Sequence, residues 1–164
     1  MVLRSDYKDL REFAQMVNSG NDFKGQTVTL GADITLTSGS EWTPIGQGVR
    51  SGGTYTVEST PFRGTFDGGD HSISGLKITV GNSNADYAFG LFGIVAEGKV
   101  QNLSLLDVNI NVTGSEIAGA VVGLLTDGGE VSNCIVGSEN DDSKVIAGRG
   151  NGGVVGRMTV EGTI

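Results

Sequence analysis

A short phrase, an apolar pair followed by glycine, occurs three times in the second half of the chain and constrains the fold more than any other feature. It occupies residues 90–93, 120–123 and 153–156. The intervals between its closing glycines are 30 and then 33 residues. Each copy leads through an acid-glycine turn to one apolar residue, in order Val100, Val131 and Ile164. Two landmarks that keep nearly one period indicate a repeat array.

The period of the array predicts an all-β fold. Short strands that recur about every 30 residues, with no helical segment between them, fit a parallel β-solenoid in which each repeat stacks on the previous one. Glycine contributes 28 of the 164 residues, which suits a chain that turns sharply many times and brings backbones close together. An antiparallel sandwich is the alternative that the pattern leaves open.

One segment of a different period precedes the array. Residues 5–17 carry a single apolar stripe at helical spacing, formed by Leu10, Phe13, Ala14 and Val17. An amphipathic helix before a long β region usually covers an open end of the sheet system. We therefore expect a capping helix whose apolar stripe is buried against the first repeat.

The region between the helix and the glycine phrases predicts irregular first repeats. From Val28 onward apolar and polar residues alternate, which indicates short strands. Residues 47–60 are polar and contain glycine, and they predict a loop or an exposed hairpin. Residues 106–112 alternate strictly between apolar and polar, which predicts one half-buried strand. The adjacent pair Leu105 and Leu106 breaks the alternation and predicts a bulge or a corner before that strand.

The array extends upstream of residue 88. An apolar residue, two small or polar residues and a second apolar residue occur at 73–76, and the pattern returns at 100–103 and 131–134. We predict three regions on this basis. They are a capping helix with its lead-in at 1–27, irregular first repeats at 28–87, and about two and a half repeats at 88–164, the last one truncated.

The charge balance excludes several classes of partner. The net charge is −8 and the eleven basic residues form no run, so a nucleic-acid surface is not expected. An acidic surface also disfavours anionic lipid. No apolar stretch approaches the roughly 18 residues of a membrane span, and the N-terminal residues contain no signal-peptide core. If the protein is exported, we expect that its signal has been removed.

Two chemically reactive side chains occur once each, and both favour a structural role. A zinc-peptidase site needs two histidines a helical turn apart and a glutamate, whereas His71 is the only histidine. We expect His71 to hydrogen-bond the Asp-Gly turn before it. Cys134 has no partner thiol, and we expect it in the core at the position held by Leu76 and Leu103 in other repeats. Neither catalytic residues nor a cofactor are predicted.

Two groups of acidic residues are candidate calcium ligands. Calcium takes six to eight oxygen ligands, often from carboxylates of one loop. Neither group has the spacing of an EF-hand or of a calcium-binding nonapeptide, so a solvated acidic loop is the first interpretation and calcium the second. The candidates are Asp67 and Asp70, which flank two glycines, and Glu139, Asp141 and Asp142 in one later loop.

A carbohydrate-active enzyme is the main catalytic alternative. Cleavage of a glycosidic bond needs two carboxyl groups about 5–10 Å apart, and the carboxylates considered are Asp67, Asp70 and Asp107. These acids stand in no catalytic signature. Aromatic rings that could serve as exposed sugar platforms are Trp42, Tyr55 and Tyr87, because the phenylalanines fall at core-like positions.

The glycine phrases at 90–93, at 119–123 leading to Asn133 and Cys134, and at 152–156 resemble a known repeat. They are similar to the GLUG repeats of large bacterial surface proteins, which also occur in IgA-specific metallopeptidases and related adhesins. Upstream residues also resemble the segment that precedes such repeats, at 32–34, 42–46 and 62–73. The first unit departs from the pattern with Leu103 in place of the cysteine, and the third stops at Ile164 before the Asn-Cys pair.

The resemblance implies a right-handed parallel β-helix in a secreted or surface-attached bacterial protein. The implied function is non-enzymatic adhesion or ligand display, with no catalytic residues to carry over. The expected partner is an extracellular glycan or a host or matrix protein. The alternatives are a carbohydrate-active β-helix enzyme and a non-catalytic accessory segment of a larger secreted peptidase.

The last repeat stops at the residue that opens a strand in the earlier repeats. We therefore expect the natural chain to continue by at least one repeat after Ile164. An uncovered end of a repeat stack exposes core and strand edges together. We expect that end to fray or to associate end to end with another copy.

Overall fold

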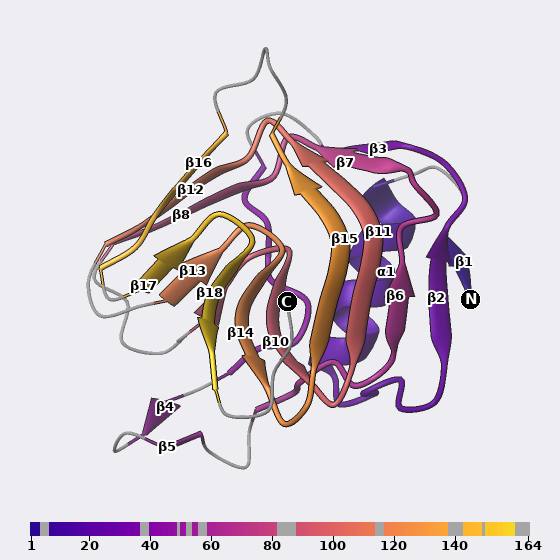
Figure 1. The fold of residues 1–164 in the computed structure, drawn as a ribbon, viewed down its shortest axis with the longest axis horizontal. Helices are drawn as coiled ribbons and strands as arrows, with labels where there is room; N and C mark the ends of the chain where they lie inside the picture. The colour runs from indigo at the N-terminus through magenta and orange to yellow at the C-terminus, as the bar shows by residue number, and fades with distance from the viewer. Residues whose placement is uncertain are drawn as a thin grey trace.

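A computed structural model describes residues 1–3, 7–36, 40–48, 50–51, 54–55, 59–81, 88–113, 117–137, 143–148 and 150–159. These residues form short strands and one helix, α1 (Tyr7–Asn18) (Figure 1). Every pair of neighbouring strands is parallel except one hairpin. The prediction of an all-β fold is confirmed, and the antiparallel sandwich is excluded.

The strands form four parallel sheets and the hairpin. The largest sheet has the order β1 (Val2–Leu3), β2 (Thr27–Leu30), β6 (Thr65–Asp67), β11 (Lys99–Leu106), β7 (Ser72–Ser74) and β3 (Ile34–Thr35), with β15 (Glu130–Val136) paired to β11. Three further sheets contain β8 (Lys77–Gly81), β12 (Asn109–Thr113) and β16 (Lys144–Ile146); β9 (Ala88–Phe89), β13 (Ile117–Gly119) and β17 (Gly150–Gly152); and β10 (Phe92–Ala96), β14 (Val122–Thr126) and β18 (Val155–Met158). The antiparallel hairpin joins β4 (Arg50–Ser51) to β5 (Thr54–Tyr55).

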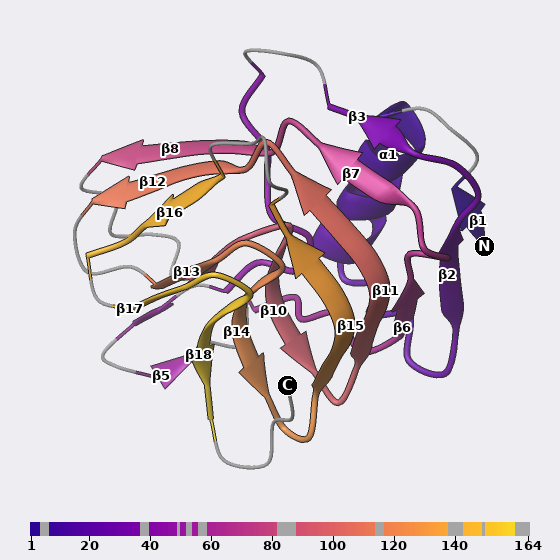
Figure 2. The ribbon, with the colours of Figure 1, turned by 45° about the horizontal axis from the view of Figure 1, so that its top comes forward.

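Successive repeats of the sequence lie side by side in these sheets. Phe92 of the first glycine phrase pairs with Val122 of the second, which pairs with Val155 of the third. Val100 pairs with Val131 in the same way. The strands of the last repeat, β15 to β18, therefore lie together at one end of the stack, while α1 lies toward the other end (Figures 1 and 2).

The predicted alignment of residues 73–76 with 100–103 is wrong. Ile73 pairs with Leu105, and the partner of Val100 is Phe66. The reason is a turn that separates β6 from β7, whereas the matching β11 is one continuous strand. Leu76 accordingly lies beside Val108 in the neighbouring repeat. The N–H of Asn109, the residue after Val108, donates to the Leu76 carbonyl. The pattern of apolar and small residues occurs on both sides of the turn and does not show which side matches.

The single strand predicted at 106–112 is also wrong, because a corner divides it. β11 ends at Leu106 and β12 begins at Asn109. Between them Asp107 has φ 51°, a left-handed conformation that turns the chain. Val108 and Ile110 keep their predicted inward orientation, at 1% and 0% exposure. The buried positions change parity between Leu105 and Val108, so the break at Leu105 and Leu106, which predicts a bulge or a corner, lies next to the observed corner at Asp107.

The predicted excursion at 47–60 interrupts a strand of the first repeat. On one side of it Ile45 bridges to Phe92, and on the other side Phe62 bridges to Val95, so both flanks lie along β10. The Thr60 N–H donates to the Gln47 carbonyl at 2.8 Å and closes the base of the excursion. Within the excursion β4 and β5 form a hairpin, which is one of the two predicted forms, a loop or a hairpin.

The closing glycines of the repeated phrases lie where two sheets approach each other backbone to backbone. A Cβ atom at Gly123 would stand 2.6 Å from the Phe89 nitrogen, and one at Gly156 would stand 2.6 Å from the Ala118 carbonyl oxygen. Side-chain carbons essentially never come within 3.0 Å of such atoms. Only glycine therefore allows β14 and β18 to pack directly on β9 and β13.

Helix α1 covers the core of the first repeats, as predicted. Its buried residues are the predicted stripe of Leu10, Phe13, Ala14 and Val17. The Phe13 ring is fully buried among the rings of Phe23, Phe62, Phe66 and Phe92, with centroid distances of 5.1–6.5 Å. The described helix spans Tyr7–Asn18, and the predicted start at residue 5 lies outside the described residues.

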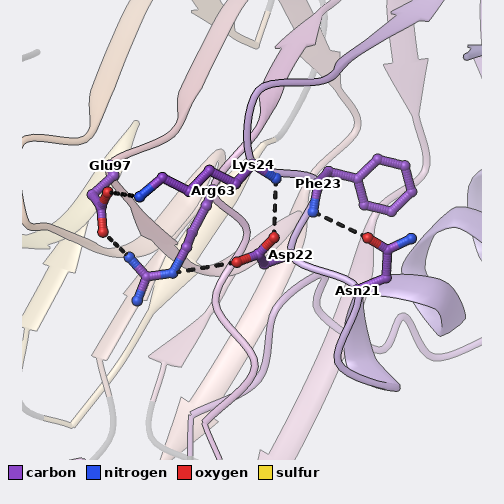
Figure 3. A network of polar contacts seen from close by, with 6 residues as sticks. All are labelled: Asn21, Asp22, Phe23, Lys24, Arg63 and Glu97. Carbon is purple, nitrogen blue, oxygen red and sulfur yellow. Dashed lines mark hydrogen bonds and ion pairs between the residues drawn. The ribbon is translucent and has the colours of Figure 1, made fainter.

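A polar network ties the lead-in after α1 to the turn that follows β10 (Figure 3). Lys24 Nζ lies 2.5 Å from Glu97 Oε2, and Arg63 pairs both with Glu97 and, at 3.8 Å, with Asp22. The hydrogen bond and charge of Lys24, with the charge of Arg63, lower the pKa of Glu97. Because Glu97 is exposed to solvent, these pairs are screened and contribute little to stability. They orient the lead-in more than they stabilise it.

The apolar side chains of the last repeat are more exposed to solvent than those of the repeat before it. Met158 is 45% exposed, whereas Leu125, its partner in the preceding repeat, is fully buried. Val145 and Val155 are half-buried, whereas their partners Ile110 and Val122 are fully buried. Ile164 and the predicted truncation lie outside the described residues, and end-to-end association stays a prediction.

We predict that Gly123→Ala destabilises the protein by about 1–3 kcal/mol, because the new methyl group forces two backbones apart. Urea unfolding at equilibrium measures this cost. Gly153→Ala is the matched control, since a Cβ atom there meets nothing within 4 Å. Equal free energies of unfolding for the two variants would contradict the close-approach explanation.

We predict that Phe13→Ala lowers the free energy of unfolding by about 3–5 kcal/mol, because it opens a cavity inside the ring cluster. Thermal and urea unfolding measure the loss. Met16→Ala, on the exposed side of the same helix at 40% exposure, should change stability by less than about 0.5 kcal/mol. A melting temperature for Phe13→Ala within a degree or two of the parent would show that α1 does not cap the stack.

Candidate ligand-binding groove

A polar groove of about 440 Å³ lies between the C-terminal half of α1 and the segment that enters the 47–60 excursion. That volume is within the range of small-molecule sites, roughly 300–1,000 Å³. Its lining is formed by Arg11, Ala14, Gln15, Asn18, Ser19, Trp42, Thr43 and Gln47.

The helical wall of the groove comes from one stripe of α1. Arg11, Gln15 and Asn18 stand at i, i+4 and i+7, so their side chains project from the same side of the helix. This stripe runs beside the buried stripe that contains Ala14. Packing of the apolar stripe on the core therefore sets the direction in which the three polar side chains project.

The opposite wall is held to α1 by the side chain of Asn18. Its Nδ2 donates to the Pro44 carbonyl at 3.0 Å, and its Oδ1 accepts from the Gly46 N–H at 2.8 Å. Gly46 has φ 76°, and a Cβ atom there would stand 2.7 Å from the Ile94 carbonyl oxygen. One amide thus fixes the distance between helix and segment, so the groove exists without a ligand.

Trp42 anchors the same wall to the stack. Its ring is buried at 6% exposure, and its Nε1 donates to the Leu91 carbonyl at 3.1 Å. Trp42, one of the three predicted sugar platforms, therefore exposes only a narrow edge of its ring to a ligand. Nothing is described for the side chain of Tyr55, and Tyr87 lies outside the described residues.

Several polar groups in the groove have no protein partner within the described part of the chain. The side chains of Gln15, Thr43 and Gln47 make no hydrogen bond there. Amides and hydroxyls without a described partner are available to a ligand with many hydroxyl or carbonyl groups.

Arg11 gives the groove a positive charge. Its Nη2 donates to the Glu41 carbonyl at 3.5 Å, and its guanidinium lies 6.0 Å from the centre of the Tyr7 ring. The Glu41 carboxylate is engaged elsewhere, 3.2 Å from Lys77 Nζ and accepting from the Thr79 N–H at 2.7 Å. Among the described residues Arg11 therefore forms no ion pair.

The predicted calcium ligand Asp67 is engaged by protein donors at a corner of the largest sheet. Its Oδ1 accepts from the Gly69 N–H at 2.9 Å and from Asn102 Nδ2 at 3.0 Å, and its Oδ2 accepts from Gln101 Nε2 at 2.9 Å. These bonds, the Gly69 N–H first, lower the pKa of Asp67. Asn133 continues the ladder by donating to Asn102 Oδ1 at 2.8 Å.

A cation at Asp67 would have to displace these N–H donors. Asp70 is exposed and has φ 60°, a left-handed turn conformation. No group of three potential metal ligands occurs among the described residues. Glu139, Asp141 and Asp142 lie outside them. Asp107, considered for glycoside cleavage, is exposed at the corner between β11 and β12 and is not in the groove.

His71 hydrogen-bonds the turn before it through its backbone N–H, as predicted, and its side chain in addition contacts Asp33. The His71 Nδ1 lies 3.3 Å from Asp33 Oδ1, one repeat earlier, while its own turn is closed by backbone bonding to Gly68. Asp33 also accepts from the Ser72 N–H, and this bond, with the smaller contribution of His71, lowers the pKa of Asp33.

Cys134 packs against the core beside Leu103, as predicted. Its side chain is half-buried, and its Sγ lies 3.4 Å from the Ser132 carbonyl. Burial raises the pKa of its thiol, which disfavours the reactive thiolate.

Comparisons with known proteins give one relative. The chain is 31% identical over 151 residues to Halomucin of Haloquadratum walsbyi, and the match covers 90% of this chain but 2% of that protein. The chain thus corresponds to a small part of the length of this relative. No protein-family profile matches, and no solved structure matches. Within the described residues no helix has the length and apolar character to cross a membrane.

We predict that Asp67→Asn destabilises the protein at neutral pH and has a smaller effect in acid. A carboxyl group whose pKa is lowered on folding stabilises the protein above its unfolded pKa, about 3.9, and this contribution disappears as pH falls through the folded value. Urea unfolding of the variant and the parent at pH 7 and near pH 2.5 measures the difference. A gap that stays constant between the two pH values would contradict the role of the ionised carboxylate.

Proposed function

We propose that this chain is a right-handed parallel β-helix of the GLUG-repeat type, and that it serves as a non-enzymatic surface or secreted module for ligand display and adhesion. The stacked parallel repeats and the glycine-dependent packing of their sheets support the architecture. The groove beside α1 supports the binding role. It is formed before any ligand arrives, because Asn18 and Trp42 are both tethered.

The chemistry of the groove lining carries the proposal. The described lining residues contribute a guanidinium, amides, hydroxyls and an indole rim, and none of them carries a carboxyl, imidazole or thiol group. Hydrolysis of a glycosidic or peptide bond by side chains requires a general acid or base, or a nucleophile, at the substrate. A groove of this composition can hold a polar ligand and has no group to cleave it.

The relative found by comparison supports an extracellular setting. Its name, Halomucin, contains the word mucin, the general term for extracellular glycoproteins. We extend this setting to the present chain and infer that its ligand is an extracellular glycan or a matrix protein. Hydroxyl and amide groups that no described residue engages suit the hydroxyl-rich surface of a glycan best.

We predict saturable binding to a subset of glycans in a screen of immobilised glycans and matrix proteins, without release of reducing ends or peptides. The double variant Gln15→Ala, Thr43→Val should weaken that binding about tenfold, through the loss of one or two hydrogen bonds. Asn109→Ala, an exposed position on β12 outside the groove, is the matched control and should bind like the parent. Degradation of any polysaccharide by the purified chain would overturn the proposal in favour of a carbohydrate-active enzyme.

A further inference from the structure

We propose that the groove beside α1 binds a glycan that carries a carboxylate, a uronic-acid type of sugar, with Arg11 as the group that recognises the charge. This inference rests on the proposed function and narrows its ligand class. Its starting point is the position of Arg11 in a groove whose described lining residues include no carboxylate.

Four other described cations form ion pairs, whereas Arg11 and Lys144 form none among the described residues. Lys24 and Arg63 pair with Glu97, Lys77 pairs with Glu41, and Lys99 pairs with Glu130 at 2.8 Å. In a chain with a net charge of −8, carboxylates are abundant. Arg11 nevertheless faces the groove without one, and a guanidinium presents a rigid fork of donors that matches a carboxylate in two parallel hydrogen bonds.

The end of α1 does not oppose an anion in the groove. The carbonyl groups of the last turn carry partial negative charge when they are unsatisfied. Here the N–H groups of Ser19, Gly20 and Asn21 donate to the carbonyls of Gln15, Val17 and Met16 at 2.9–3.1 Å. The carbonyls nearest the groove are therefore already engaged.

The remaining lining complements the rest of a sugar. Gln15, Thr43 and Gln47 offer side-chain donors and acceptors that no described residue uses, and sugar hydroxyls can act as both. A volume of about 440 Å³ suits one or two sugar rings. A phosphate group carries nearly two charges and is usually held by clusters of arginines, whereas the described lining contains one arginine. One cation among neutral polar groups matches a singly charged sugar.

Isothermal titration of the intact chain tests the inference with four probes of similar size. They are a glucuronic-acid tetrasaccharide, its carboxyl-reduced neutral counterpart, a sulfated neutral tetrasaccharide and a short Asp-rich peptide. We expect the uronic-acid probe to bind at least tenfold more tightly than the other three. In the parent chain, NMR shift changes on binding should map to Gln15, Ser19 and Thr43.

Variants assign the preference to Arg11. Arg11→Ala should reduce the affinity for the uronic-acid probe to that for the neutral probe, and Arg11→Lys should retain part of the preference. Lys144→Gln is the matched control, because it makes the same change in net charge at an exposed site on β16, away from α1. It should leave the preference unchanged. Arg11 is exposed, so melting temperatures near that of the parent are expected for all three.

Different failures have different meanings. Equal affinity for the charged and neutral probes, insensitive to Arg11→Ala, would overturn the carboxylate inference and leave the proposed function standing. Tighter binding of the sulfated probe or of the peptide would overturn the ligand class. Shift changes that map away from the groove would overturn the site. If none of the four probes binds and the wider screen also finds no ligand, both proposals fail.

Discussion

The contact between the glycine backbones of neighbouring sheets is the constraint on which the other features depend. Gly93, Gly123 and Gly156 each stand where a side chain would overlap backbone atoms of the facing sheet or of the preceding repeat. These glycines have no Cβ atom. The sheet of β9, β13 and β17 can therefore pack directly on the sheet of β10, β14 and β18. This direct packing narrows this side of the stack and leaves the larger interior near α1 for bulky side chains.

The wider interior explains why the protein needs its helix. Five phenylalanines meet there, and Phe13 is the member that α1 contributes. Without α1 the rings of Phe62, Phe66 and Phe92 would face water. Burial of one helical stripe then determines where the adjacent stripe points, which places Arg11 and Gln15 over the segment at 42–47. The groove is therefore a consequence of how the stack is capped.

The groove combines rigidity with unsatisfied polar groups, a combination typical of recognition sites. The side chains of Asn18 and Trp42 form hydrogen bonds to backbone groups of the scaffold. Thr43 and Gln47, in the same wall, keep their side chains free of described partners. A ligand thus meets polar groups that no described residue engages. The Asp67–Asn102–Asn133 ladder is the opposite case, because its polar groups satisfy one another along the stack and serve the scaffold.

The amino-acid sequence by itself determined the repeat period, the register of the three glycine phrases and the buried stripe of the helix. Each follows from a local rule, either the close packing that only glycine allows or the spacing of side chains on one side of a helix. The register of the first repeats was decided by the tertiary structure, since the same apolar pattern occurs on both sides of the turn between β6 and β7. The pairing of His71 with Asp33, 38 residues earlier, was decided in the same way. The groove was also decided by the tertiary structure, because periodicity shows which side of a helix is polar but not which distant segment lies opposite that side.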